Sequence, residues 1–311
     1  MKKFCLGIFG ILVIFIITLP LLYITVAIST NLTPIIESLL FGTTREDGNS
    51  YVRMTDYKVW SELKLNEQKG LILGSSTAYR NINPFILDTI TKINWFNLAN
   101  TSQSPVVSLA LLKQIVNSQS GNIDYVLLDV CIPIIENNGY ESAFDLIANS
   151  KMDFIQKADL FFIEPSFKML NHFSYKTIKN AVPSQDYLLR NDNNGHYLGK
   201  GFTCSLNSRK KLSLSDFPKG VQYFKMTNEI NQIKELCDEK EITLFINLAP
   251  VLNFDTFIFN TKGINLILND DFNNRLDFFY DSHHMNCDGA NFYTEKLALK
   301  LLSSGLMIKS N

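Results

Sequence analysis

The sequence predicts an α/β fold: a doubly wound parallel sheet of about five strands, with an inserted mainly helical subdomain and an N-terminal transmembrane helix. Three features predict it: a long apolar run at the N-terminus, short apolar segments alternating with helical patterns from Gly70 onward, and one long break in that alternation. Short buried strands separated by helices are typical of a parallel sheet covered on both faces. With 311 residues, 46% of them hydrophobic, the chain can bury a sizeable core.

The N-terminal segment is almost entirely apolar from Phe4 to Ile28. Because about twenty such residues span a bilayer, we expect residues 1–29 to form a single-pass membrane anchor. Lys2 and Lys3 should stay in the cytoplasm, which places the rest of the chain on the periplasmic or extracellular side. The alternative is a cleaved signal peptide with its cleavage site near 27–29, although the apolar run exceeds the usual signal core.

Two further regions follow the anchor. Residues 30–69 are expected to form a juxtamembrane stalk and the edge of the domain, and residues 70–311 the α/β domain itself. Within that domain the hydrophobic periodicity predicts five strands and four helices. The expected strands are Leu71–Leu73, Trp95–Ala99, Tyr125–Val130, Thr243–Leu248 and Leu276–Tyr280, and the expected helices are Pro84–Thr91, Val106–Ser118, Val221–Lys240 and Gly289–Leu302.

The alternation stops between Pro133 and Pro218, a stretch of about 85 residues. A connection of this length is far outside the ordinary range and predicts an insertion, with helical pieces around 143–158. Ligands of a doubly wound sheet bind at the C-terminal ends of its strands, so the insertion would lie over the site as a cap. Packing on the side of the sheet is the alternative. Arg209-Lys210-Lys211 could meet anionic polymer or lipid head groups, or could simply be solvated.

Charge and cysteine content narrow the functional classes. A formal net charge of −1 at pH 7 lacks the basic surplus of a nucleic-acid-binding protein. No glycine-rich phosphate-binding motif occurs, so we expect no nucleotide or redox cofactor. The cysteines lack metal-ligand spacing, and the sequence leaves the pairing of the four outside the anchor open. Cys131, in a predicted strand, is expected to be a small core residue.

Two short motifs carry the expected chemistry. Gly74-Ser75-Ser76 ends the first predicted strand, where glycine permits a tight turn that exposes a hydroxyl near the start of the next helix. Asp281 precedes His284 by three residues, just before the final predicted helix. A carboxylate at that spacing can bind the imidazole Nδ1, so that Nε2 acts as a general base.

The order of these motifs resembles the SGNH (GDSL-type) hydrolase and acyltransferase superfamily, over roughly Gly70 to Leu302. The resemblance implies that Ser76 is the nucleophile, His284 the base and Asp281 its orienting acid, on an SGNH or flavodoxin-like sheet. Ser75 stands where the family usually has Asp. This Gly-Ser-Ser variant is similar to the membrane-anchored branch that includes the teichoic-acid D-alanyl transfer protein and the alginate O-acetylation proteins.

Further site residues follow from the chemistry of acyl transfer. The amide of Ser76 and that of Ser102, in the loop after the second strand, are expected to donate to the oxyanion, with the side chain of Asn100 as an alternative. The asparagine of the family's third block is absent. Arg80, one helical turn beyond Ser76, could orient an anionic substrate group or form a salt bridge at the sheet rim. His283 competes with His284, and the trio with Asp281 raises a metal site, but three adjacent ligands make a poor zinc pattern, so we expect no metal.

These features together predict a membrane-anchored, outward-facing serine esterase or O-acyltransferase that acts on an acylated cell-envelope polysaccharide or similar polymer. A membrane-bound acyltransferase is a further possible partner, and nucleic acid is not expected. The alternative is a non-catalytic envelope protein, glycan-binding or accessory, on a degenerate version of the same fold. The sequence does not distinguish esterase from transferase.

Overall fold

The computed structural model describes residues 59, 62–117, 123–135, 139, 142–143, 146, 196–205, 212–217, 219–258 and 263–305. The expected anchor at 1–29 and nearly all of the stalk at 30–69 lie outside these residues. Within the part of the chain that is described, no helix is both long enough and apolar enough to cross a membrane.

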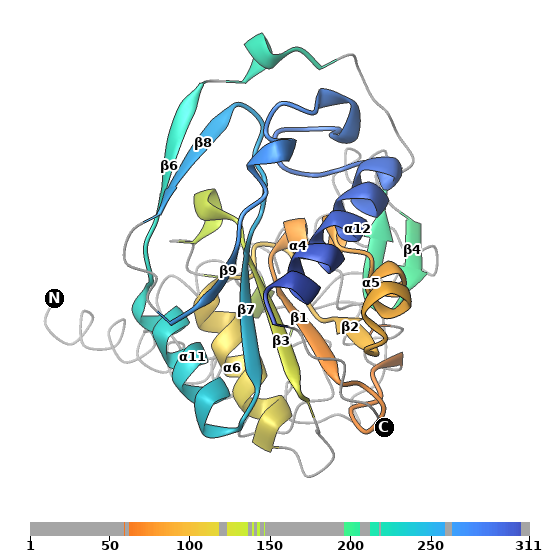
Figure 1. Ribbon diagram of the computed structural model, residues 1–311, viewed down its shortest axis with the longest axis vertical. Helices are drawn as coiled ribbons and strands as arrows, with labels where there is room; N and C mark the ends of the chain where they lie inside the picture. The colour runs from red at the N-terminus through yellow and green to blue at the C-terminus, as the bar shows by residue number, and fades with distance from the viewer. Residues whose placement is uncertain are drawn as a thin grey trace, which may run out of the picture.

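A five-stranded sheet forms the centre of the fold (Figure 1). Its strands are β1 (Gly70–Gly74), β2 (Trp95–Asn97), β3 (Tyr125–Val130), β7 (Thr243–Leu248) and β9 (Asn265–Ile267). They lie in the order β2-β1-β3-β7-β9, and every neighbouring pair is parallel. This is the 2-1-3-4-5 order of a doubly wound sheet, in which ligands bind at the C-terminal strand ends, where the winding direction changes between β1 and β3.

Helices cover both faces of the sheet (Figure 1). One face carries α4 (Ser76–Asn81), α5 (Pro84–Thr91) and α12 (Cys287–Ser303), and the other carries α6 (Pro105–Asn117) and α11 (Asn228–Glu239). Alternate residues of β1 follow this division, because Leu71 and Leu73 belong to the core under α6 and α11, whereas Ile72 belongs to the core under α12. The α/β class and the parallel five-stranded sheet predicted from the sequence are therefore confirmed.

Two predicted elements were wrong. Leu276–Tyr280 is not the fifth strand: Leu276–Phe278 forms the 3₁₀ helix η5 after η4 (Asp270–Phe272), and β9 occupies the sheet edge instead. Val221–Lys240 is not one helix, because its first residues form β6 (Gly220–Phe224), which pairs in parallel with β8 (Phe254–Ile258). The helix α11 begins later, where the hydroxyl of Thr227 caps it by accepting from the Ile230 amide at 3.3 Å.

Most of the expected insertion at 133–218, including nearly all of the helical pieces expected at 143–158, lies outside the described residues. Its described elements are the 3₁₀ helices η2 (Ile132–Ile134) and η3 (Leu214–Asp216) and an antiparallel hairpin of β4 (His196–Gly199) and β5 (Phe202–Cys204). The hairpin is fixed to the domain where Tyr197 donates to Glu62 at 2.7 Å and where Lys200 binds Asp88. Strand β5 packs against α4, which brings this part of the insertion to the helix that carries Ser76.

A disulfide joins the hairpin to the last helix. Cys204, at the end of β5, is bonded to Cys287, the first residue of α12, with 5.2 Å between their Cα atoms. Beside it, the Cys287 amide donates to the Ser205 carbonyl at 3.0 Å. Cys131 and Cys237 are buried thiols, and for Cys131 this agrees with the expected core position.

Candidate active site

Ser76 lies on the tight turn between β1 and α4. Gly74 ends the strand with φ +145°, and a Cβ atom there would lie 2.5 Å from the Asp129 carbonyl of the neighbouring strand, so the close approach of β1 to β3 requires glycine. Ser75 is the N-cap residue of α4, and Ser76 is its first helical residue, 8% exposed. The turn therefore places the Ser76 hydroxyl at the C-terminal edge of the sheet, beside the point where the winding direction changes.

The Asp281 to His284 segment is a loop that precedes α12. It is closed by the Tyr280 amide, which donates to the His284 carbonyl at 3.1 Å. Asn81, the last residue of α4, holds it on the other side, because its Nδ2 donates to the His283 carbonyl at 2.9 Å and its Oδ1 accepts from the Met285 amide at 2.8 Å. The helix that begins with Ser76 thus ends with the residue that fixes the histidine loop.

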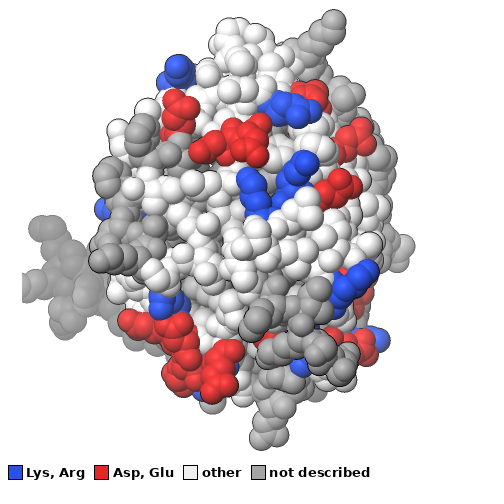
Figure 2. All heavy atoms as spheres, viewed as in Figure 1, with Lys and Arg blue, Asp and Glu red and all other residues white. Residues whose placement is uncertain are grey.

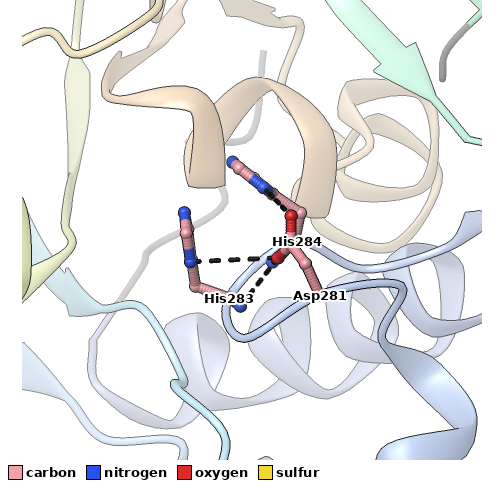
Figure 3. A group of neighbouring side chains, drawn as sticks. All are labelled: Asp281, His283 and His284. Atoms are coloured by element: carbon pink, nitrogen blue, oxygen red, sulfur yellow. Dashed lines mark hydrogen bonds and ion pairs between the residues drawn. The ribbon is translucent and has the colours of Figure 1, made fainter. Parts of the chain in front are cut away.

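These two regions bring Ser76, His284 and Asp281 into one hydrogen-bonded chain. His284 Nε2 lies 2.7 Å from Ser76 Oγ, and His284 Nδ1 lies 2.7 Å from Asp281 Oδ2. Figure 3 shows Asp281 below the ring of His284, with the ring extending away from the loop. All three residues predicted for catalysis are therefore in contact, in the order that the expected chemistry requires.

The surroundings of Asp281 fix its charge and the tautomer of His284. Burial acts to raise the pKa of Asp281, but the hydrogen bond to His284 and the charges of both imidazoles hold it well below its ordinary value. Its Oδ1 also accepts from the amides of His283 at 3.0 Å and His284 at 2.7 Å. An ionised Asp281 that accepts from Nδ1–H leaves Nε2 of His284 as the acceptor for the Ser76 hydroxyl.

Arg80 and Tyr280 form one side of the site. The Tyr280 ring is stacked on the His284 ring, with 5.6 Å between centroids and 14° between planes, and the Arg80 guanidinium lies 5.8 Å from the Tyr280 centroid. Burial disfavours the charge of Arg80, but Tyr79, Tyr280 and Asp281 together raise its pKa above the ordinary value. Arg80 is therefore a permanent cation next to the stacked rings, as the sequence-based interpretation requires of a group that orients an anion.

The loop after β2 lies beside the turn at residues 74–76. The Asn100 amide donates to the Gly74 carbonyl at 3.1 Å, and the Asn100 side chain is buried, with its Oδ1 accepting from the Thr101 amide at 2.7 Å. Ser102 has φ +53°, in the left-handed region that glycine adopts most readily. The structure brings Asn100 to the turn, and no described contact joins Ser102 directly to Ser76, His284 or Asp281.

A buried polar network lies behind the serine. Thr77 donates to Asp129 Oδ2 at 2.6 Å, Asn247 donates to the other oxygen, and Asn247 also reaches the Tyr293 hydroxyl at 2.8 Å. Burial raises the pKa of Asp129 from 3.8 to about 6, although both hydrogen bonds oppose the rise. Since Thr77 gives its proton to Asp129, the Ser75 hydroxyl at 3.0 Å must donate to Thr77. Ser75 is thereby held in a structural role.

A small open hollow lies next to this network. It is lined by residues at the ends of β1 and β3 and in the loop after β2, among them Ser75, Gln103, Asp129 and Cys131. Gln103 is one of its lining residues, and among the described side chains its Oε1 is buried without a hydrogen-bond partner. The hollow adjoins the turn at residues 74–76, at the C-terminal strand ends where ligands of such sheets bind.

Asp281, His283 and His284 are close enough to be considered as metal ligands, since one ligand atom from each lies within 4.8 Å of the others (Figure 3). The carboxylate is already fully engaged, however, with Oδ2 on His284 Nδ1 and Oδ1 on two backbone amides. His284 Nε2 faces Ser76. The hydrogen bonds favour a Ser-His-Asp arrangement over a cation site.

Several residues of this site were not found from the sequence. Asn81 and Asp129 occupy positions whose local pattern gives no signal of their role, because each acts on residues distant in the chain. Tyr280 stacks on His284 only four residues later, but the sequence pattern does not show which way its ring turns. The Cys204–Cys287 bridge was left open for the same reason.

Comparison with known proteins gives no assignment: no protein-family model matches the chain, and no curated protein matches it significantly.

Proposed function

We propose that this protein is a serine esterase or O-acyltransferase related to the SGNH superfamily, with Ser76, His284 and Asp281 as its triad. The single observation that carries the proposal is the chain of two 2.7 Å contacts from Ser76 Oγ through His284 to Asp281 Oδ2. A serine that is only exposed at the surface, or an aspartate that only caps a helix, would need neither of these contacts. Together they are what a hydroxyl requires to become a nucleophile at neutral pH.

In the proposed reaction Ser76 Oγ bonds to the carbonyl carbon of an ester as its proton passes to His284 Nε2. His284 then returns that proton to the leaving alkoxide, and Asp281 stabilises the imidazolium in between. The amides of Ser76 and Ser102, or the Asn100 side chain, would donate to the oxyanion. Water as the second acceptor gives an esterase, and a sugar hydroxyl gives a transferase.

The proposed location is the outer side of a membrane. The Cys204–Cys287 bridge supports it, because structural disulfides persist in extracytoplasmic compartments and are rare in the cytosol. The apolar run from Phe4 to Ile28 would supply the anchor. In this place the substrate would be an acylated cell-envelope polysaccharide or similar polymer, with a membrane-bound acyltransferase as the partner that supplies or receives the acyl group.

The distribution of charged side chains on the protein agrees with a substrate that is uncharged or carries charges of both signs. Figure 2 shows acidic and basic side chains scattered over the face drawn, with wide uncharged areas between them. The formal net charge of −1 points the same way. We therefore expect local groups such as Arg80 to select the substrate, and not electrostatic attraction over the whole surface.

The test is labelling of the detergent-solubilised full-length chain with a fluorophosphonate, a reagent that phosphonylates activated serines. The wild-type chain should be labelled, and Ser76→Ala and His284→Ala should not. Ser75→Ala is the matched control, because Ser75 is the adjacent hydroxyl, bonded to Thr77, and its loss should leave labelling intact. If the folded wild-type chain is not labelled, the non-catalytic glycan-binding or accessory function replaces this proposal.

A further inference from the structure

The oxyanion of the proposed reaction lacks a donor from the third strand. The residue at the end of β3 that faces the site is Asp129, whose two carboxylate oxygens accept hydrogen bonds from Thr77 and Asn247. An ionised carboxylate cannot donate to an oxyanion and disfavours negative charge nearby. Stabilisation of the oxyanion therefore calls for a donor on another side of the serine.

His283 lies on that other side. Its ring is in contact with the His284 ring, with 4.0 Å between centroids and a tilt of 44°. Figure 3 shows the two rings side by side, with their outer nitrogens directed to the same side of the loop. Because His284 Nε2 is 2.7 Å from Ser76 Oγ and the two rings are in contact (Figure 3), the outer nitrogen of His283 lies on the side of the loop where the serine is. The His283 side chain is 28% exposed, so a substrate can approach it.

The inner nitrogen of His283 is already engaged. Its Nδ1 lies 2.7 Å from the Ser282 hydroxyl and 3.8 Å from Asp281 Oδ1, the second distance being too long for a hydrogen bond. The Ser282 hydroxyl has a proton to donate, and Nδ1 is its neighbouring acceptor. A neutral ring that accepts at Nδ1 carries its proton on Nε2, the outer nitrogen of the ring.

The groups around His283 favour the neutral ring. Burial, together with the positive charges of His284 and Arg80, lowers the pKa of His283 from 6.5 to about 4 against the opposing effect of Asp281. At neutral pH the ring therefore neither carries a charge nor competes with His284 for the serine proton. A neutral imidazole can still polarise a carbonyl by donating a hydrogen bond.

We propose that His283 is a catalytic residue, and that its Nε2–H donates to the oxyanion formed when Ser76 attacks an ester carbonyl. The inference rests on the proposed function. In this step the Ser76 Oγ–carbon bond forms, the electron pair of the carbonyl moves to its oxygen, and the serine proton goes to His284. His283 keeps its own proton throughout and contributes only the hydrogen bond.

The test compares His283→Ala, His283→Gln and His283→Asn in the full-length chain, with an aryl acetate ester as the substrate. The glutamine amide nitrogen reaches the position of Nε2, whereas the asparagine amide reaches only that of Nδ1. We expect alanine and asparagine to lower kcat by about 10²-fold to 10³-fold with little change in KM, and glutamine to restore the rate to within about tenfold of wild type. Ser282→Ala, which removes the donor to Nδ1, should cause a smaller loss.

Fluorophosphonate labelling and thermal melting of the same variants separate the possible failures. A wild-type chain that is not labelled overturns the proposed function and this inference together. A labelled wild-type chain, with His283→Ala turning over the ester at the wild-type rate, overturns the inference alone. So does a glutamine variant that melts normally but is as slow as alanine. If a chelator abolishes wild-type turnover and zinc restores it, the trio binds metal and His283 is not the donor.

Discussion

Ser76 and His284 meet in one site but are held by different kinds of structure. Ser76 lies between β1 and α4, with the buried network of Thr77, Asp129 and Asn247 behind it. His284 lies in a loop without regular secondary structure, and its side chain is 15% exposed. The loop depends on separate attachments: the Asn81 side chain, the Asp281 carboxylate and the disulfide at the start of α12.

The difference indicates that the serine is positioned by the sheet itself and the histidine by a few side-chain contacts. The geometry of a turn between two core elements cannot change without disturbing the core. A loop held by individual hydrogen bonds can be displaced one contact at a time. Substitutions at the two ends of the site should therefore separate effects on catalysis from effects on folding.

The largest effect is expected from Asp281→Asn. The asparagine amide would donate to His284 Nδ1, which leaves the proton on Nε2 and removes the acceptor for Ser76. We expect the rate of ester turnover to fall about 10⁴-fold, equivalent to about 5.5 kcal/mol of activation free energy. Asp277→Asn is the matched control, because Asp277 is an exposed carboxylate paired with Arg275 at the surface. Equal rates for the two variants would remove Asp281 from the triad.

The next effect is expected from loss of the disulfide. Replacing both Cys204 and Cys287 by serine opens a loop between residues 83 positions apart, which in the chain-entropy description costs about 4 kcal/mol. The melting temperature should fall by about 10 °C, since each kcal/mol corresponds to about 2–4 °C in a domain of this size. A reductant should lower the melting temperature of the wild-type chain to the same value and leave the double variant unchanged. A reductant effect on the double variant would place the stabilising bond elsewhere.

A third effect concerns the serine end and the pH dependence of stability. The pKa of Asp129 rises from 3.8, the ordinary value taken for the unfolded chain, to about 6 in the folded protein. The folded state therefore binds this proton more tightly than the unfolded state. The carboxyl group therefore favours the fold at pH 4 and below, and that contribution is lost as the pH rises through 6, by about 3 kcal/mol in all. In urea unfolding, the stability of wild type relative to Asp129→Asn should fall by most of this amount, about 2.4 kcal/mol, between pH 4 and pH 7. A constant difference across this range would mean that Asp129 titrates normally.

The smallest effect in free energy is expected from Asn81→Ala, which releases the histidine loop. Its loss leaves the His283 carbonyl and the Met285 amide without their partner, at a cost of about 2 kcal/mol. Fluorophosphonate labelling should slow by about tenfold to a hundredfold, because the loop carries both Asp281 and His284. Asn265→Ala, which removes a hydrogen bond to the Leu244 carbonyl on β7, is the control for stability alone. Similar labelling rates in both variants would show that Asn81 does not position the loop.

Much of the fold could be predicted because local pattern and tertiary packing agree there. Helix α5 has its predicted bounds, since Asn83 caps it and Pro84 begins it. Strands β3 and β7 also have their predicted bounds, because each is a mainly apolar run buried in the sheet, with Asp129 as the polar exception in β3 and Thr243 and Asn247 in β7. The prediction failed at Leu276–Tyr280, where Phe279 is buried from a loop and Leu276 and Phe278 pack against the core from a 3₁₀ helix. Periodicity cannot separate such a segment from a strand.

The sequence by itself determined which segments form most strands of the sheet and which three residues make up the proposed triad. Gly74 and Ser76 are recognisable because they lie at the end of a predicted strand. The three-residue spacing of Asp281 and His284 lets the Asp281 carboxylate contact both the backbone amide and the ring of His284. Both features are local properties of the chain. Only the tertiary structure decided that these two segments, 208 residues apart, lie 2.7 Å from each other. It also decided which groups surround Asn81, Asp129 and His283, and it decided the pairing of Cys204 with Cys287. The physical reason is that hydrogen-bond partners, burial and pKa values depend on which distant residues the packed sheet brings together, and a local pattern carries no record of them.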